Sequence, residues 1–139
     1  MSSYNVFITG GASGIGYGIA ERLAAKGHHI LIADINLDAA TAAADKLKAA
    51  GGSAQPVEID VTDAAGVAAL PEKLKDTPVD ILVNNAGIQH VSKIEDFPPE
   101  KWQLLINIML VAPALLTQAF LPQMRSNNFG RIINIGSIH

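Results

Sequence analysis

The chain has 139 residues, a length that fits one domain or part of one, since domains usually span about 100–200 residues. Hydrophobic residues make up 49% and charged residues 17%, which excludes a disordered, solvating polypeptide. The absence of cysteine excludes a disulfide scaffold, a thiolate zinc site and a cysteine nucleophile, and is compatible with a cytoplasmic protein. A net charge of −3 and an aromatic content of 5% give no reason to expect nucleic acid or an anionic membrane as a partner.

Short apolar runs alternate with helical stretches along the chain. Strands are predicted at residues 6–8, 29–34, 55–59, 80–83 and 131–135, and helices at residues 14–26, 37–50, 64–75 and 99–125. Gly27 and Gly51 follow the first two helices, at positions where glycine commonly ends a helix. The alternation predicts a parallel sheet with helices on both faces.

Right-handed crossovers and the glycine-rich first turn favour the strand order 3-2-1-4-5. This order places the fifth strand at an edge, although Ile132, Ile133 and Ile135 suit an interior strand. We therefore expect the sheet to continue past His139. The predicted fold is a Rossmann-type, doubly wound α/β domain over residues 1–139, incomplete at the C-terminus, with the last strands missing.

Residues 104–121 are apolar enough to imitate a membrane helix, which needs about 20 apolar residues. Asn107, Pro113 and Gln118 interrupt this run, so a helix buried in the domain or at a subunit interface is expected instead. The N-terminus has no basic region ahead of an apolar core, and no secretory signal is expected. His28 and His29 have no second set of ligands beside them, and no metal is expected.

A glycine-rich segment, T-G-x-x-x-G-x-G, lies directly between the first strand and the first helix. This context favours a site for a pyrophosphate, which would bind the free N–H groups at the helix N-terminus. Gly10 would permit the tight turn, Gly14 the approach of the phosphate, and Gly16 the close packing of helix and strand. Ser13 and Ile15 complete the candidate loop.

Asp34 ends the second strand, about 20 residues after the glycine loop begins. A carboxylate there can accept hydrogen bonds from both hydroxyls of an adenosine ribose and would repel a 2′-phosphate. The neighbouring Ser13, Ile35 and Asn36 are not basic, so NAD is favoured over NADP. The alternative is a solvated carboxylate at the end of a strand.

Two further motifs follow strands: Asp60-Val61 after the third, and N-N-A-G, which includes Asn85, Ala86 and Gly87, after the fourth. With the glycine loop and the acidic residue after the second strand, they resemble the short-chain dehydrogenase/reductase family. The resemblance covers essentially the whole chain. It implies an NAD-dependent oxidoreductase in which Asp60 and Val61 contact the adenine and the N-N-A-G turn lines the nucleotide site.

The same resemblance assigns catalytic roles to Asn107, inside the long helix, and to Ser137, at the end of the fifth strand. Asn107 would hold the water of a proton relay, and Ser137 would polarise the substrate oxygen. The family also uses a Tyr-x-x-x-Lys pair, whose lysine lowers the pKa of a phenol that normally titrates near pH 10. Neither Tyr4 nor Tyr17 has a lysine four positions later, so the chain alone is expected to be inactive.

Gln89, after N-N-A-G-I, and His139, two residues past Ser137, resemble the D-3-hydroxybutyrate dehydrogenases of this family. In that group the two positions bind the substrate carboxylate, with His90 a weaker alternative here. The resemblance implies a hydroxy acid substrate oxidised to acetoacetate, as in ketone body metabolism, and a homotetramer for the complete protein. A short-chain dehydrogenase for another alcohol, diol or sugar and a non-catalytic NAD-binding fragment remain alternatives.

Overall fold

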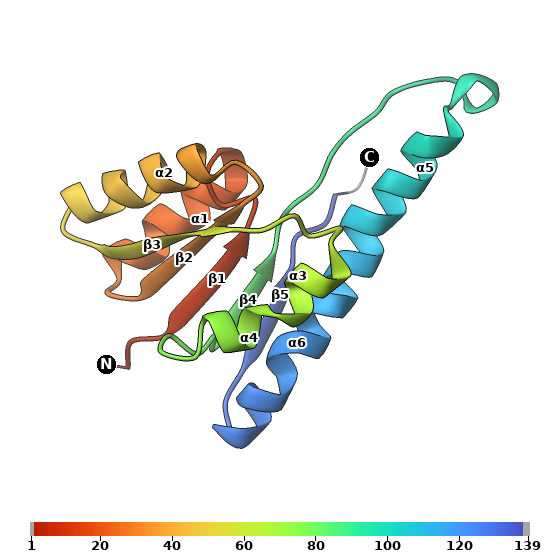
Figure 1. Cartoon of the computed structure of the whole chain (residues 1–139). Helices are drawn as coiled ribbons and strands as arrows, with labels where there is room; N and C mark the ends of the chain where they lie inside the picture. The colour runs from red at the N-terminus through yellow and green to blue at the C-terminus, as the bar shows by residue number, and fades with distance from the viewer. Residues whose placement is uncertain (1, 138–139) are drawn as a thin grey trace.

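Five parallel strands form one sheet in the order β3-β2-β1-β4-β5, as predicted, in a computed structural model that describes residues 2–137 (Figure 1). The strands are β1 (Asn5–Thr9), β2 (His29–Asp34), β3 (Ser53–Glu58), β4 (Ile81–Asn84) and β5 (Arg131–Asn134). The helices are α1 (Gly14–Ala25), α2 (Leu37–Ala49), α3 (Ala64–Ala68), α4 (Leu70–Lys73), the 3₁₀ turn η1 (Ile94–Asp96), α5 (Pro99–Ile106), the π-helical turn η2 (Asn107–Val111) and α6 (Ala112–Ser126).

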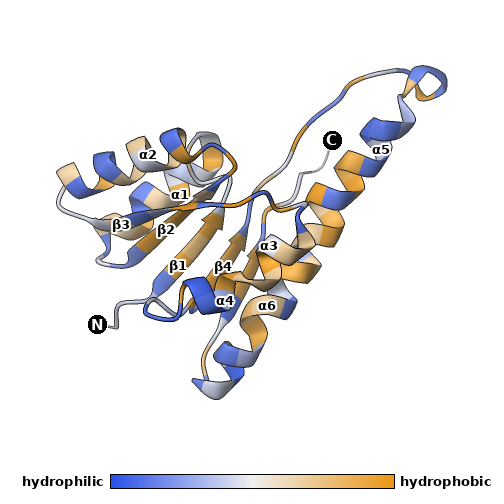
Figure 2. Cartoon of the chain, in the orientation of Figure 1, coloured by the Kyte–Doolittle hydropathy of each residue, from blue (hydrophilic) through white to orange (hydrophobic). Residues whose placement is uncertain are grey.

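Alternate side chains of the strands enter two apolar cores, one on each face of the sheet. Val6 and Ile8 of β1 face the alanine-rich sides of α1 and α2. Phe7, between them, faces α3, α4 and α6, and its ring lies 5.1 Å from that of Phe120. All of these strand residues are fully buried, and burial of one such side chain stabilises the fold by about 1.5–3 kcal/mol. Figure 2 shows the apolar strands between the two helical layers.

The boundaries of the first two helices follow local signals in the sequence. Ser13 is extended before α1, and the Asn36 side chain accepts a hydrogen bond from the Ala39 N–H at the start of α2. Gly27 and Gly51 have φ values of +92° and +91° just past the two helices, a conformation that side chains disfavour. These ends lie within one residue of their predicted places.

The helix predicted over residues 64–75 is wrong as a single element. The structure has two short helices there, α3 and α4, which meet at Ala69. Pro71, which has no N–H, lies in the first turn of α4, where proline is tolerated, and cannot continue the hydrogen bonds of α3. The third strand also begins earlier than predicted, at Ser53, and ends at Glu58.

The long helix over residues 99–125 is present but is not a uniform α-helix. Its middle, η2, is a π-helical turn in which the Ala112 N–H donates to the Asn107 carbonyl. Pro113 follows and supplies no N–H, so the regular α-helical pattern cannot run unbroken through this segment. Asn107, Ile108 and Pro113 therefore lie at an irregular junction beside the sheet.

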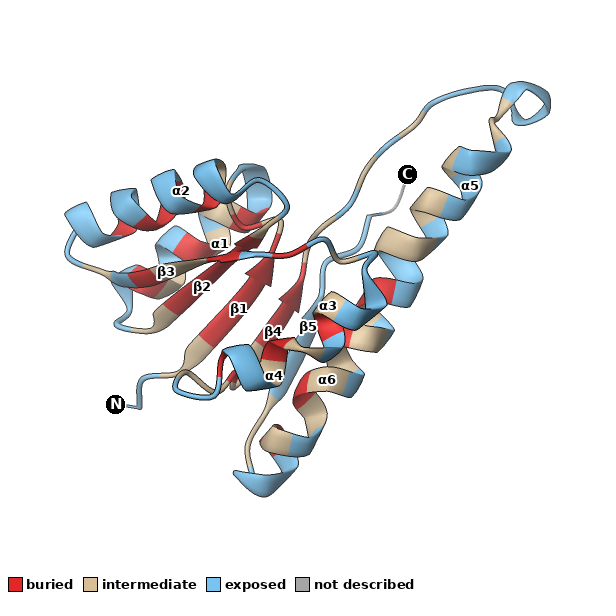
Figure 3. Ribbon diagram, in the orientation of Figure 1, coloured by how far each residue is buried: buried red, intermediate tan, exposed pale blue. Residues whose placement is uncertain are grey.

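The α5–η2–α6 rod extends well past the carboxyl ends of the strands, and its outer part is exposed (Figure 3). Among residues 2–137, the stretch Pro99–Ser126 is long and apolar enough to cross a membrane, as core helices of soluble proteins also can be. Its Leu116, Phe120 and Met124 are buried against the sheet. β5 is the edge strand, and all four of its residues are exposed.

Candidate functional site

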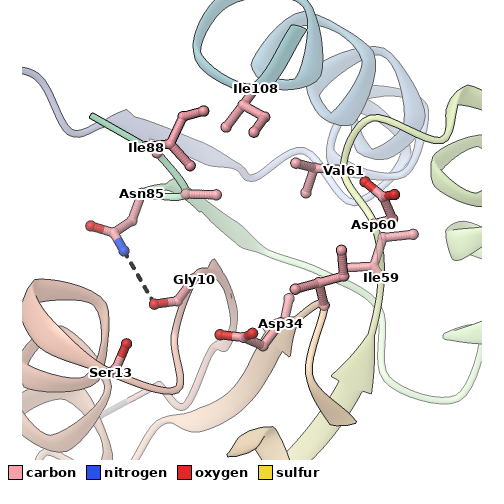
Figure 4. A pocket seen from close by; sticks show the side chains of 13 residues that line it. Gly10, Ser13, Asp34, Ile59, Asp60, Val61, Asn85, Ile88 and Ile108 are labelled. Atoms are coloured by element: carbon pink, nitrogen blue, oxygen red, sulfur yellow. Dashed lines mark hydrogen bonds between the residues drawn. The ribbon is translucent and has the colours of Figure 1, made fainter. Parts of the chain in front are cut away.

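A cleft of about 360 Å³ lies at the carboxyl ends of β1, β2 and β4 (Figure 4). The chain leaves β1 toward β2 and later returns to β4 on the other side, so the cleft is at the point where the strand order reverses. Ligands of open α/β sheets bind at such points. The cleft is lined by Gly10, Ser13, Ala33, Asp34, Ile35, Ile59, Asp60, Val61, Asn85, Ala86, Gly87, Ile88 and Ile108.

Most of the residues predicted to hold the cofactor line this one cleft, although they come from four separate segments. They are Gly10, Ser13, Asp34, Asp60, Val61, Asn85, Ala86 and Gly87. Gly14, Ile15 and Gly16 form the adjoining first turn of α1. The Ile15 side chain lies in a separate apolar hollow beside Val83 and Ile133, so its contribution to the cleft would be its backbone amide.

In the glycine loop, Gly10 forms the tight turn and Gly16 lies in close contact with its neighbours. Gly10 has a φ of +62° and sits against Ala86, 3.2 Å from where its Cβ would be. A Cβ on Gly16 would overlap the Gly10 carbonyl and the Asn85 amide. The contact of Gly16 is therefore with the loop and with Asn85, whereas the sequence predicted close packing of helix and strand. Gly14 also has a positive φ, +57°, but no atom lies near its missing side chain.

Thr9 ties the loop to the segment after β4, a role that the sequence analysis missed. Its buried hydroxyl accepts hydrogen bonds from the N–H groups of Asn85 and Ala86, both 2.9 Å away, and donates to the Val83 carbonyl. The Asn85 side chain in turn donates to the carbonyls of Thr9 and Gly10. The only local signal was a threonine at the end of an apolar strand.

The N-terminus of α1 is open toward the cleft. Ser13 makes no side-chain capping bond to this turn, unlike Asn36, which caps α2. The first intrahelical bond runs from the Tyr17 N–H to the Ser13 carbonyl, 3.1 Å away, and the N–H groups before Tyr17 belong to the turn that a helix leaves unpaired. Such a turn attracts anions because its N–H groups and the helix dipole both point outward.

Two carboxylates stand on the opposite side of the cleft from Ser13. Asp34 Oδ1 accepts a hydrogen bond from the Asn36 N–H at 3.1 Å, which orients the group at the end of β2. Asp60 Oδ1 accepts from the Thr62 hydroxyl at 2.6 Å and from the Thr62 N–H at 2.9 Å. These bonds, with the hydroxyl as the larger cause, hold the pKa of Asp60 below its usual value. This side of the cleft is thus negative and suited to hydroxyl and amine donors.

Four isoleucines of the lining were not predicted by the sequence analysis. Ile35 and Ile59 flank the two carboxylates, and Ile88 and Ile108 close the other end. Ile35 and Ile59 are chain neighbours of predicted site residues, so adjacency was an available signal. Ile88 and Ile108 lie in a long loop and in an irregular helix, whose positions relative to the sheet no local pattern indicates.

The predicted catalytic residues lie close to the cleft but outside its lining. Asn107 begins η2, and its Oδ1 accepts a hydrogen bond from the Gln103 side chain at 3.1 Å. The next residue, Ile108, lines the cleft. Ser137 is exposed and follows β5 at the same edge of the sheet.

The predicted substrate residues are only partly described. Gln89 is exposed and directly follows Ile88, which lines the cleft. His90 contacts the ring of Phe97 edge-on at 5.0 Å. His139 lies outside the described residues. Tyr4 precedes β1 at the amino edge of the sheet, where it stacks on Phe129, so it is remote from the cleft.

In residues 2–137 no group of three or more His, Cys, Asp or Glu side chains could hold a metal ion. The lining of the cleft carries carboxylates, an amide, a hydroxyl and backbone N–H groups. Together they match a ligand with an anionic centre, a hydroxyl-bearing end and flat apolar rings.

Comparison with known proteins agrees with this arrangement. The sequence profile described as short chain dehydrogenase matches residues 4–139. A D-beta-hydroxybutyrate dehydrogenase of Cupriavidus necator is 40% identical over 144 residues, covering 100% of this chain and 55% of the relative. A 5-keto-D-gluconate 5-reductase of Escherichia coli K12 is 36% identical over 140 residues, covering 99% and 55%.

A solved structure of similar fold is the L-sorbose reductase of Gluconobacter frateurii, complexed with NADPH and L-sorbose. It superposes with a TM-score of 0.92 at 36% identity, covering 99% of this chain and 54% of that one. The chain thus spans about 55% of the length of the relatives it matches.

Proposed function

Because the chain belongs to the short-chain dehydrogenase family, we propose that its cleft binds NAD and serves the oxidation of D-3-hydroxybutyrate to acetoacetate. The observation that carries the cofactor proposal is that an uncapped helix N-terminus and the Asp34 carboxylate share one cleft. The pyrophosphate of NAD would bind at the helix N-terminus, and the diol of its adenosine ribose would bind to Asp34. When bound, it supplies the acceptor for the substrate hydride.

Each part of the cleft has a defined task in this proposal. The N–H groups of the first turn of α1 hold the pyrophosphate. Because Gly10 and Gly16 have no side chains, the loop between them can lie close to it. Asp34 accepts hydrogen bonds from the adenosine ribose hydroxyls. Asp60 and Val61 receive the adenine, with Val61 packing against its ring and the ionised Asp60 accepting from its amine.

The choice of NAD over NADP depends on the charge of Asp34. A 2′-phosphate would lie against this carboxylate, and none of the cleft-lining residues is basic. The L-sorbose reductase complexed with NADPH shows that similar folds accept the phosphorylated cofactor. The discriminating quantity is therefore the affinity of this chain for each nucleotide.

We predict that the chain binds NAD at least about tenfold more tightly than NADP, and that Asp34→Ala removes most of this difference. Titration calorimetry with both nucleotides measures it. Asp38→Ala is the matched control, because it deletes an exposed carboxylate in the first turn of α2, outside the cleft. Equal affinities in the unsubstituted chain would contradict the assignment of NAD.

The roles around the substrate are part of the same proposal. Ser137 donates a hydrogen bond to the reacting oxygen, and Asn107 holds the water that relays protons. Gln89 and His139 donate to the substrate carboxylate and so orient C3. The proton transfer itself needs a Tyr-x-x-x-Lys pair, and this chain has none, so we propose that it shows no turnover alone.

In a protein that includes the chain and turns over substrate, Gln89→Ala should lower kcat/KM for D-3-hydroxybutyrate about tenfold or more, because one donor to the carboxylate is lost. The Kd for NAD should not change. Gln118→Ala, which removes an exposed amide from α6, is the control. Unchanged hydroxybutyrate turnover would favour the second candidate, a sugar or polyol substrate, which the relationship to the 5-keto-D-gluconate 5-reductase supports.

We further propose that the complete protein is a cytoplasmic homo-oligomer, a tetramer. Its binding partner is then a small hydroxy acid, and neither nucleic acid nor a membrane. The support is the exposed apolar surface of η2, at Met109, Leu110 and Val111. The third candidate function is that of a nucleotide-binding fragment, which binds NAD without hydride transfer.

A further inference from the structure

Two asparagines pair across the last two strands, on the face of the sheet that α6 covers. Asn84 and Asn134 are in register, and the Asn84 amide donates to Asn134 Oδ1 at 2.9 Å. Asn84 is only 6% exposed, and its Oδ1 is buried without a hydrogen-bond partner among the described residues. Exchanging the oxygen and nitrogen of this amide leaves a buried polar end unpaired all the same. Since buried polar groups are almost always paired, this amide indicates a partner that is not a protein group.

A small cavity of about 10 Å³ lies beside Asn84, separate from the cofactor cleft. It is bounded by Thr9 and Ala86 on the sheet side and by Ile108 and Pro113 on the helix side. A cavity of this size is close to the smallest that holds one water molecule, and it is too small for any larger ligand. Most of its other lining is apolar, so the amide is the chief polar group that such a water would meet.

On its helix side the cavity is bounded by Ile108, Ala112 and Pro113, which belong to or adjoin the irregular turn η2. Pro113 has no N–H, so the Met109 carbonyl, four residues earlier, cannot receive its usual helical hydrogen bond. In the same turn, the Ala112 N–H donates to the Asn107 carbonyl, five residues earlier. The irregular pairing around η2 therefore leaves main-chain carbonyls of this junction available to a donor. A buried water usually has two to four hydrogen-bond partners, and Asn84 Oδ1 with one such carbonyl would supply two.

We propose that one water molecule is bound in this cavity, where it donates to Asn84 Oδ1 and to a main-chain carbonyl of the η2–α6 junction. The water links β4 to the irregular turn of the long helix. Val61, Ala86 and Ile108 line both this cavity and the cofactor cleft, so the bound water supports the wall between them. The site differs from the relay position, because Asn107 does not line the cavity and its side chain bonds Gln103.

A high-resolution crystal structure of the 139-residue chain tests this directly. We expect one ordered water within hydrogen-bond distance of Asn84 Oδ1, in density calculated before any solvent is added. A cavity without density would overturn the proposal, as would an Asn84 amide fully paired with protein groups. The result does not depend on which nucleotide or substrate the protein uses.

Magnetic relaxation dispersion of water nuclei gives an independent measurement in solution, because it counts long-lived internal waters. Asn84→Leu should reduce that count by one per chain, since it removes the amide and fills the cavity. Asn134→Asp is the control, because it keeps an Oδ1 acceptor for the Asn84 amide at an exposed position and should retain the water. An equal count in Asn84→Leu and the unsubstituted chain would contradict the site. If Asn84→Leu does not fold, the crystal structure of the unsubstituted chain still decides.

Discussion

At Gly16, the first turn of α1 lies so close to the Gly10 carbonyl and the Asn85 amide that no side chain fits between them. The Asn85 amide is itself fixed, because it donates to the carbonyls of Thr9 and Gly10. The shape of the proposed pyrophosphate site therefore depends on the absence of a single methyl group.

Gly16→Ala should destabilise the chain by about 1–3 kcal/mol and weaken NAD binding, because the loop must move to admit the Cβ. Gly18→Ala, one half-turn further along α1, meets no atom within 4 Å and should stabilise the chain by about 0.5–1 kcal/mol. Urea unfolding and NAD titration of both variants measure these effects. Equal stability of the two variants would show that the close approach at Gly16 does not exist in solution.

At the scale of elements, α1 and α2 begin in opposite ways. The Asn36 side chain satisfies the Ala39 N–H and so caps α2, whereas α1 has no side-chain cap and faces the cleft. Both helices follow strands that end at the same edge of the sheet. A side chain thus satisfies an N–H group at the start of α2, while the first turn of α1 keeps its N–H groups for the anion proposed above.

Asn36→Ala should lower the free energy of unfolding by about 1 kcal/mol, because the Ala39 N–H loses its acceptor. Asn36→Asp keeps a capping oxygen and should retain most of the stability. Thermal or urea unfolding of the three proteins compares them. A cap that contributes nothing would leave Asn36→Ala as stable as the unsubstituted chain.

The secondary-structure elements also show which parts of the fold the sequence patterns could predict. The strand order was predictable because apolar strands alternate with helices, and the handedness of crossovers leaves few arrangements. The break at Pro71 and the π turn before Pro113 were not predicted, because proline at a first helical turn reads equally as a start or a continuation. Ile108 lines the cleft from that irregular turn, so hydrophobic periodicity alone could not predict its position.

On the scale of the whole molecule, large apolar side chains are exposed both on the long helix and on the edge strand. Met109 and Leu110 of η2 are 54% and 65% exposed, and Ile133 of the edge strand is 45% exposed. The edge strand also presents unpaired main-chain groups on its outer side. Neighbouring exposed apolar side chains, such as Met109 and Leu110 in η2, are a candidate association site.

We expect the chain to associate in a concentration-dependent manner and Leu110→Lys to weaken this association about tenfold or more, because a charge enters an apolar contact. Sedimentation velocity over a concentration series measures it. Ala42→Lys adds the same charge to the exposed side of α2 and should leave association unchanged. A chain that stays monomeric at all concentrations would contradict association through η2.

The hydrogen bonds of Thr9 have a consequence for the order of folding. They join residues separated by 74 to 77 positions in sequence, so the loop after β1 meets its neighbours only when β4 has docked. Closing so long a segment costs entropy that local pairs such as β1 with β2 avoid in part. During synthesis the glycine loop would leave the ribosome early, yet acquire its final shape only after the fourth strand has emerged. Nucleotide affinity would then report the docking of β4, because a nascent chain that ends before β4 lacks five of the thirteen residues that line the cleft.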